Sequence, residues 1–339
     1  MTVQARFFLG IGAAVLAVAL LACACVAYGS TVIPLPDILG AIGKLLGLGD
    51  GAPMTPIDRI VTDLRLPRAI LAIAVGAGLG VIGLLLQTVT RNDLADPFLF
   101  GLSAGAAAGA VAVITRIGDR LGVLTLPIAA FCGGMCATAV VLLLLRRAAG
   151  YGPERLVLAG LAVSFLFTAL TNYLVFSGDQ RAAHSVLFWT MGGLGLATWQ
   201  NIGIGLFGAA LALVYALLRH RALDALLAGE QTAESLGISV TRLRNTTFLV
   251  ASFATALLVS IAGVIGFIGL MIPHVARAFA GPLHARLAVA SAVMGAALLL
   301  GSDLLARTLL PPQELPVGVV TSSIGAAFVM ALILKPRRS

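Results

Sequence analysis

The residues of this chain that could do chemistry are few and widely spaced. Its 339 residues include 14 acidic residues, 4 histidines and 4 cysteines. None of them clusters with the spacing of a metal site, or of a nucleophile beside its base. Cys23 with Cys25, and Cys132 with Cys136, stand in apolar runs where packing is the expected role. The sequence predicts no catalytic residue and no metal-ligand set.

Ionisable groups do stand inside one apolar stretch, GVIGFIGLMIPHVAR at residues 263–277. Its helix-breaking residues include Gly266 and Pro273, and His274 and Arg277 follow them. Irregular helix is tolerated at membrane depth only inside protein or beside a water-filled path. We therefore expect a short or broken helix around residues 271–280, with two interpretations of His274 and Arg277. They are either functional groups on a path or caps for carbonyls that the break frees.

The longest polar stretch is RHRALDALLAGEQTAESLGISVTRLR at residues 219–244. Its pattern predicts two short amphipathic helices, each ended by a glycine. The residues that define them are Leu223, Leu226, Leu227 and Gly229 for the first, and Glu230, Ala233, Leu236 and Gly237 for the second. Such a pair would present a surface to a partner; the alternative is an ordinary connecting loop.

The elements that must position these residues are membrane helices. The chain is 60% hydrophobic and 11% charged, with a mean hydropathy of +1.05. A soluble domain carries about twice that share of charge. The net charge of +8 is attributed to arginines in loops, so we do not expect nucleic-acid binding. The fold class predicted is an all-α polytopic membrane protein, forming one transmembrane domain over residues 1–339.

Stretches without charged residues predict the membrane-spanning segments. Nine are clear, within residues 7–36, 69–90, 98–115, 121–145, 156–178, 182–218, 245–273, 287–302 and 315–334. Arg6 before the first run, and Lys335, Arg337 and Arg338 after the last, place both termini in the cytoplasm. An even number of crossings then follows, and residues 245–280 are long enough for a full span and a broken one. We expect about ten transmembrane helices, the first of them retained rather than cleaved as a signal peptide.

Several stretches together resemble one family, the permeases of type II ABC importers for cobalamin, ferric siderophores and haem. In chain order they are RLPR at 65–68, Gln87 with RNDLADP at 91–97, GLSAG at 101–105, FWTMGGL at 188–194, LLAGEQTAESLG at 226–237, GVIGFIGLMIPHVAR at 263–277, GSDLLAR at 301–307 and ELPVGVVTSSIGA at 314–326. One departure is Asp93, where the family usually has proline.

The resemblance implies a homodimer in the bacterial inner membrane with a path along its two-fold axis. Two cytoplasmic ATPases carrying ATP and Mg would dock on residues 226–237, and one periplasmic binding protein would sit above. The chain itself has no G-x-x-x-x-G-K-[ST] loop and is not expected to hydrolyse ATP. The site residues implied fall into three groups. They are Leu226, Gly229, Glu230, Ala233, Leu236 and Gly237 for ATPase coupling, Asn92 and Leu94 for a cytoplasmic gate, and Arg65, Arg68 and Arg307 for docking the binding protein.

Two questions stay open at this point. A secondary transporter is the alternative of a different class, but it needs carboxylates in its spans. Only Asp303 approaches one, and Arg307 four residues on is expected to pair with it. The cargo is expected to be an iron complex, haem ahead of a ferric siderophore, with cobalamin third. His184, in an outer loop, is a candidate ligand contact or simply a solvated histidine.

Overall fold

The computed structural model describes residues 3–29, 31–48, 53–118, 121–147, 153–178 and 183–334, and these ranges contain helices and no strand. The charges used to place the termini fall elsewhere: residues 335–339 and the side chain of Arg6 lie outside the described part. The fold class predicted from composition is confirmed.

Eight described helices are long and apolar enough to cross a membrane. They are α1 (Val3–Ala27), α4 (Leu66–Thr90), α6 (Thr125–Arg147), α7 (Pro153–Ser177), α9 (Trp199–Leu227), α11 (Val240–Ala262), α13 (His284–Thr308) and α14 (Val317–Leu334). Two shorter apolar helices, α5 (Leu102–Ala112) and α12 (Ile268–Ala280), complete the set. The expectation of about ten membrane helices is confirmed.

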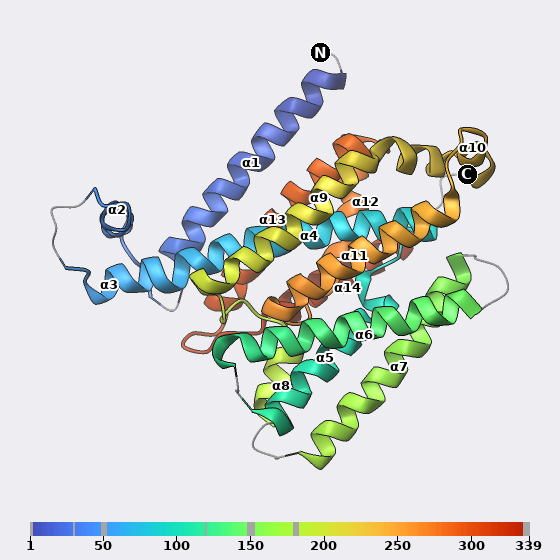
Figure 1. The fold of residues 1–339 in the computed structure, drawn as a ribbon. Helices are drawn as coiled ribbons and strands as arrows, with labels where there is room; N and C mark the ends of the chain where they lie inside the picture. Colours follow the sequence, from blue (N-terminus) through green and yellow to red (C-terminus); the bar gives the residue numbers. More distant parts are fainter. Residues whose placement is uncertain are drawn as a thin grey trace.

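Short helices mark the two ends of the bundle. At one end, here called the outer end, lie α2 (Leu35–Leu45), α3 (Pro56–Arg59) and α8 (Ala183–Thr190) (Figure 1). At the other, the inner end, lies α10 (Glu230–Ser235), and α1 begins on the same side (Figure 1). Two 3₁₀ turns (Pro97–Phe100, Gly122–Leu124) and two π turns (Ile60–Arg65, Val113–Ile117) join or extend helices, and the first π turn makes α3 and α4 continuous.

Helix α4 is the centre of the bundle and packs against α9, α11, α12 and α13. Its most apolar window is 83% buried. Glycines make this possible: a Cβ at Gly76 would collide with the Gly295 carbonyl of α13, and one at Gly83 with the Gly269 carbonyl of α12. Without a hydrophobic driving force in lipid, such close backbone contacts hold helices together.

The glycine repeat of α5 packs in the same way. A Cβ at Gly105 would strike the Gly133 carbonyl of α6, and one at Gly109 the Ala129 carbonyl. The four-residue spacing of these glycines thus gives α5 a helix-packing face.

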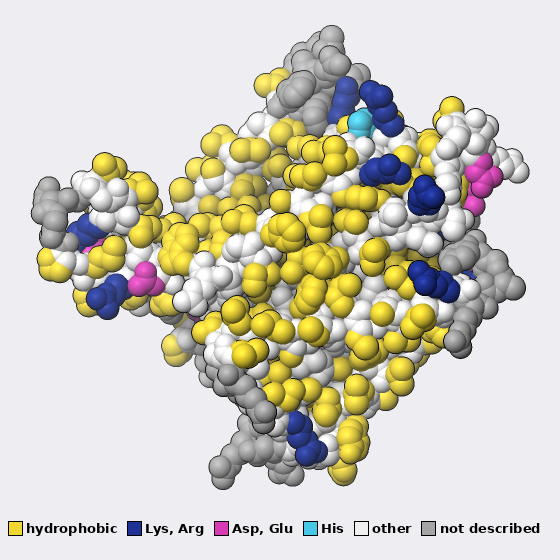
Figure 2. Space-filling view, viewed as in Figure 1, with side chains coloured by type: hydrophobic (Ala, Val, Ile, Leu, Met, Phe, Trp, Pro, Cys, Tyr) yellow, Lys and Arg dark blue, Asp and Glu magenta, His cyan; other side chains and the backbone are white. Residues whose placement is uncertain are grey.

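The surface fits a bilayer. Figure 2 shows hydrophobic side chains covering the middle of one face, while several dark-blue Lys and Arg side chains gather toward the inner end at upper right. Exposed apolar side chains on the spanning helices include Leu20, Phe165 and Phe207. In water such a surface would aggregate; in hydrocarbon it is the expected one.

The structure corrects three sequence expectations about boundaries. Residues 223–227 do not form a separate helix, because α9 runs unbroken from Trp199 to Leu227. The apolar run at residues 182–218 likewise divides into the short α8 and the start of α9. The discontinuity lies at residues 263–267, so Gly266 falls within it but Pro273, His274 and Arg277 lie inside α12.

Candidate functional site

The inner end carries the predicted partner surface as a single short helix, α10. Gly229 precedes it with a φ of 121°, and Gly237 follows it with a φ of 78°. Side chains avoid such backbone conformations, so both turns favour glycine. Ala233 of α10 is fully buried, while Leu236, which follows the helix, is 66% exposed. A polar surface with one projecting leucine faces away from the bundle.

The six residues predicted for ATPase coupling therefore divide in two. Leu226 and Ala233 are fully buried and anchor the surface. The other four are at least partly exposed: Gly229, Glu230, Leu236 and Gly237. Their contact with an ATPase stays a prediction.

Glu230 ties α10 to the bundle. Its Oε1 lies 2.7 Å from Nη2 of Arg244 on α11 and 3.9 Å from Nη1 of Arg91. Arg244 is buried, and its Nε donates to the Val89 carbonyl of α4 at 2.9 Å. One carboxylate thus connects α10, α11 and the inner end of α4.

The turn after α4 holds the predicted gate residues. Arg91 ends α4 in the left-handed conformation, with a φ of 50°. Asn92 Oδ1 accepts a 3.0 Å hydrogen bond from the Leu94 N–H and closes the turn, a role asparagine often has. Leu94 is 48% exposed at the inner end. Both residues are where a constriction could form, and their gating role stays a prediction.

Asp93, the departure from the family's usual proline, has an ion-pair partner. Its Oδ1 lies 3.0 Å from Nη1 of Arg277 on α12. Arg277 also donates through Nη2 to Gln87 Oε1 at 3.0 Å. An ion pair therefore holds the gate turn against α12, whereas a proline at this position would fix the turn by restricting its backbone.

The carbonyl that Pro273 frees in α12 is capped by a residue that the sequence prediction did not assign. Pro273 lacks an N–H, so the Gly269 carbonyl four residues earlier loses its helical partner. Gln87 Nε2 donates to that carbonyl at 3.2 Å and to the Leu270 carbonyl at 3.1 Å. His274 instead packs edge-on against Phe328, with ring centroids 5.6 Å apart. The capping role proposed for His274 and Arg277 thus belongs to Gln87, whose signal was a lone amide in an apolar span.

Asp96, also unassigned by sequence reasoning, ends the gate turn. It is buried, and its Oδ1 accepts from the Phe98 N–H at 2.9 Å. Burial raises the pKa of this carboxyl to about 6, although hydrogen bonds from backbone N–H groups oppose the shift.

A hydroxyl, an imidazole and a carboxylate also meet at the inner end. His284 Nδ1 lies 2.7 Å from Asp224 Oδ1, and its Nε2 lies 2.7 Å from Thr88 Oγ1. The order resembles a nucleophile–base–acid triad, but His284 is fully buried and Thr88 nearly so. No substrate reaches the hydroxyl. These contacts fasten α13, α9 and α4 together, and Asp224 also accepts the His284 N–H at the start of α13.

Two other segments of the chain pack closely against the break between α11 and α12. A Cβ at Gly192, before α9, would strike the Val264 carbonyl, and one at Gly325 of α14 would strike the Phe267 side chain. Phe267 itself has a φ of 68°, which is uncommon for a bulky side chain. The irregular backbone is thus enclosed by protein, as membrane depth requires.

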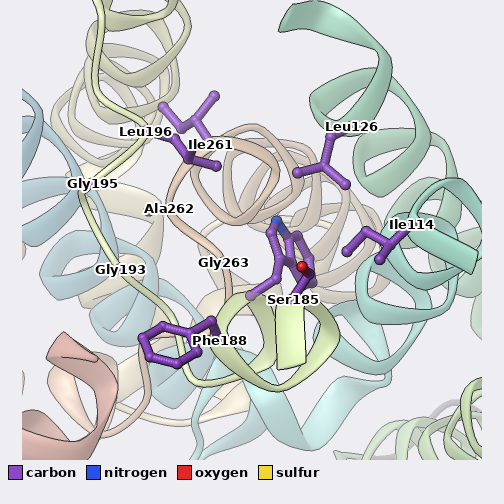
Figure 3. A pocket seen from close by; sticks show the side chains of 11 residues that line it. Ile114, Leu126, Ser185, Phe188, Gly193, Gly195, Leu196, Ile261, Ala262 and Gly263 are labelled. Atoms are coloured by element: carbon purple, nitrogen blue, oxygen red, sulfur yellow. The ribbon is translucent and has the colours of Figure 1, made fainter. Parts of the chain in front are cut away.

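A pocket of about 510 Å³ adjoins this break at the outer end. Figure 3 shows Ser185 and Phe188 of α8 on one side, Ile114 and Leu126 on another, and Leu196 with Ile261 opposite. Most of its lining is apolar. His184 packs on Phe188 with ring centroids 4.6 Å apart, which places an imidazole beside the pocket.

The three outer arginines are placed differently from one another. Arg65 and Arg307 are 7% and 4% exposed. Arg65 donates to the Val26 and Ala27 carbonyls, and Arg307 to the Cys25 and Tyr28 carbonyls, so both hold the outer end of α1. Both side chains are therefore turned into the protein at this end, and their docking role stays a prediction.

Arg68 lies nearer the surface than the other two. Its Nε is 2.9 Å from Asp303 Oδ1, and its Nη1 is 2.7 Å from Glu314 Oε2. The predicted pairing of Asp303 with Arg307 is confirmed at 3.0 Å. A role in docking stays a prediction for all three arginines, and Arg68 has the better access.

Comparisons with known proteins agree with this architecture. A family model described as the FecCD transport family matches residues 15–335. Relatives include the Fe(3+) dicitrate transport system permease protein FecD of Escherichia coli, 39% identical over 278 residues, covering 82% of this chain and 86% of that protein. The cobalamin import system permease protein BtuC of Halobacterium salinarum is 39% identical, covering 84% and 75%. The hemin transport system permease protein HmuU of Yersinia pestis is 36% identical, covering 81% and 83%.

A solved structure is similar over nearly the whole chain. It is described as an inward-facing conformation of an ABC transporter of metal-chelate type. The TM-score is 0.82 at 26% sequence identity, and the match covers 96% of this chain and 99% of that one.

Proposed function

This chain belongs to the FecCD transport family of ABC importer permeases for iron chelates, haem and cobalamin, and from that premise we propose that its own cargo is an iron complex, with haem favoured. As a family member it is a multi-pass membrane protein, the transmembrane subunit of a type II ABC importer and not itself the ATPase. Such a permease works with ATPase and binding-protein partners.

Sequence identity does not rank the cargoes. The relatives named for ferric dicitrate, cobalamin and hemin are 39%, 39% and 36% identical. The observation that favours haem is the outer pocket, where exposed His184 packs on Phe188 beside an apolar cavity. A flat apolar macrocycle with a central iron suits an aromatic ring beside an imidazole, whereas a hydroxamate or citrate chelate presents mainly polar oxygens.

The assembly proposed is a homodimer with two ATPases, which bind ATP and Mg, and one periplasmic binding protein. Two features support it. Helices α7 and α14 are only 17% and 28% buried in their most apolar windows, which leaves faces for a second copy. Helix α10 projects from the inner end with a polar face, where a cytoplasmic ATPase would dock. ATP binding would move α10, and the Glu230–Arg244 contact would pass that motion to α4.

The test uses the assembled transporter with its binding protein, titrated with haemin and followed by Soret absorbance. We expect a Soret shift that saturates, and ATP-dependent loss of haem into vesicles. His184→Ala should weaken the shift, while His220→Ala, a histidine at the inner end of α9, should not. Saturable cobalamin uptake that haemin does not compete with would overturn the haem assignment in favour of cobalamin.

A further inference from the structure

A second cavity lies on the membrane-facing side of the inner half, between α1 and the α12–α13 corner. Its volume is about 610 Å³. Helix α1 packs chiefly on α13, and its inner end projects away from the bundle (Figure 1). The wedge opened by this divergence is lined by Gly10 and Ala14 of α1, Phe279 and Gly281 at the end of α12, and Ala290 and Met294 of α13.

The wedge is open, and its described lining is mostly apolar. A Cβ at Gly10 or at Gly281 would meet nothing within 4 Å, and Phe279 is 74% exposed. Among the described residues that line it, the charged one is Arg286. Residues 286, 290 and 294 are four apart, so they lie in one row along α13. Arg286 is in the first turn of that helix, and Met294 is about 12 Å deeper in the membrane.

This arrangement complements the shape of a phospholipid. A cation lies at the interface, where the headgroup would be, and small and apolar side chains follow along the furrow, where an acyl chain would be. About 12 Å is most of the hydrocarbon depth of one leaflet. A helix does not fit, because a cylinder ~10 Å across with this volume is about 8 Å long, little more than one turn.

We propose that the wedge between α1 and α13 binds one phospholipid of the inner leaflet, with its anionic headgroup at Arg286 and an acyl chain against Gly10, Ala290 and Met294. The lipid fills the space beneath the diverging end of α1 and holds that helix at its angle to α13. Basic groups beside membrane helices on this side select anionic headgroups.

The experiment is native mass spectrometry of the detergent-purified permease–ATPase complex with added phosphatidylglycerol or phosphatidylcholine. We expect phosphatidylglycerol to be retained preferentially. Arg286→Gln should reduce that preference roughly fivefold, the change equivalent to ~1 kcal/mol per basic residue at a membrane surface. Arg219→Gln, an exposed arginine at the inner end of α9, is the matched control and should leave it unchanged.

Filling the wedge tests the acyl chain. Gly10→Leu places a side chain in the furrow and should remove the retained lipid. Gly12→Leu makes the same change two residues away on an equally open part of α1, and should not. Wild-type retention in both Arg286→Gln and Gly10→Leu would overturn the proposal. So would a Gly10→Leu variant that keeps its lipid but loses a subunit, since the wedge would then be a protein contact.

Discussion

Neutralising Glu230 should uncouple α10 from the gate turn without unfolding the permease. Glu230→Gln keeps the shape of the side chain but removes the charge that faces Arg244 at 2.7 Å. The buried Arg244 keeps its bond to the Val89 carbonyl, so α11 stays attached to α4. The substitution weakens the contact between Glu230 of α10 and Arg244, which connects α10 to α11 and α4.

The size of the effect follows from exposure. Arg244 is 6% exposed, which argues for a strong charged hydrogen bond of ~1.5–3 kcal/mol. Glu230 is 38% exposed, which argues for the ~0.2–1 kcal/mol of a surface pair. An intermediate loss of about 1–1.5 kcal/mol, or roughly tenfold in the equilibrium between attached and detached α10, is expected.

The assay places an environment-sensitive fluorophore at Leu94→Cys, in a variant whose exposed Cys23, Cys132 and Cys136 are replaced by serine. In the assembled complex, the ATP-driven change at the gate turn should fall severalfold in Glu230→Gln, while ATP hydrolysis continues. Glu154→Gln, an exposed acidic residue of α7, serves as the control. A full-sized signal in Glu230→Gln would show that α10 reaches the gate by another route.

Three further outcomes are expected. Alanine at both Asn92 and Leu94 should increase passive leak of cargo from proteoliposomes without ATP, because the bond that closes the turn and its projecting side chain are lost; unchanged leak would mean that the turn only connects two helices. Arg68→Glu should weaken docking of the binding protein in a pull-down at low salt while basal ATP hydrolysis persists, and wild-type affinity would remove Arg68 from the docking surface. For Asp96 the folded pKa of about 6 lies above its ordinary value of 3.8, so the stability it contributes is present at pH 4 and is lost as the pH rises through 6. Asp96→Asn should therefore remove up to about 3 kcal/mol of the stability lost between pH 4 and pH 7, measured by thermal unfolding, and an unchanged pH slope in the variant would contradict the burial argument.

Features that depend on composition, such as which segments span the membrane, can be predicted from the sequence. Features that depend on where a helix ends or where a side chain points cannot. Charge-free runs locate the long helices because hydrocarbon admits few charges. The sequence predicts a separate helix at residues 223–227 within the polar stretch, but α9 continues without a break to Leu227. Leu223 and Leu226 are fully buried within that same helix.

The proline in α12 is a second case in which the local sequence does not reveal the structure. Pro273 is expected to break the helix, but the loss of one N–H needs only one substitute donor. Gln87, nearly two hundred residues earlier in the chain, supplies it. Its contribution depends on the close approach of α4 and α12 at Gly83 and Gly269, which no local pattern reveals.

The outer arginines show why a charge on the unexpected side of a membrane need not face a partner. A helix ends with carbonyls that have no partner within the helix. At the end of α1, Arg65 takes those of Val26 and Ala27, and Arg307 takes those of Cys25 and Tyr28. Gly29 lies so close that a Cβ there would be 3.2 Å from both guanidinium groups. Because the least buried long helix is held at its outer end by these two side chains, reversing either charge should loosen α1 before it affects docking, and Arg68 is the residue on which a docking test can be decisive.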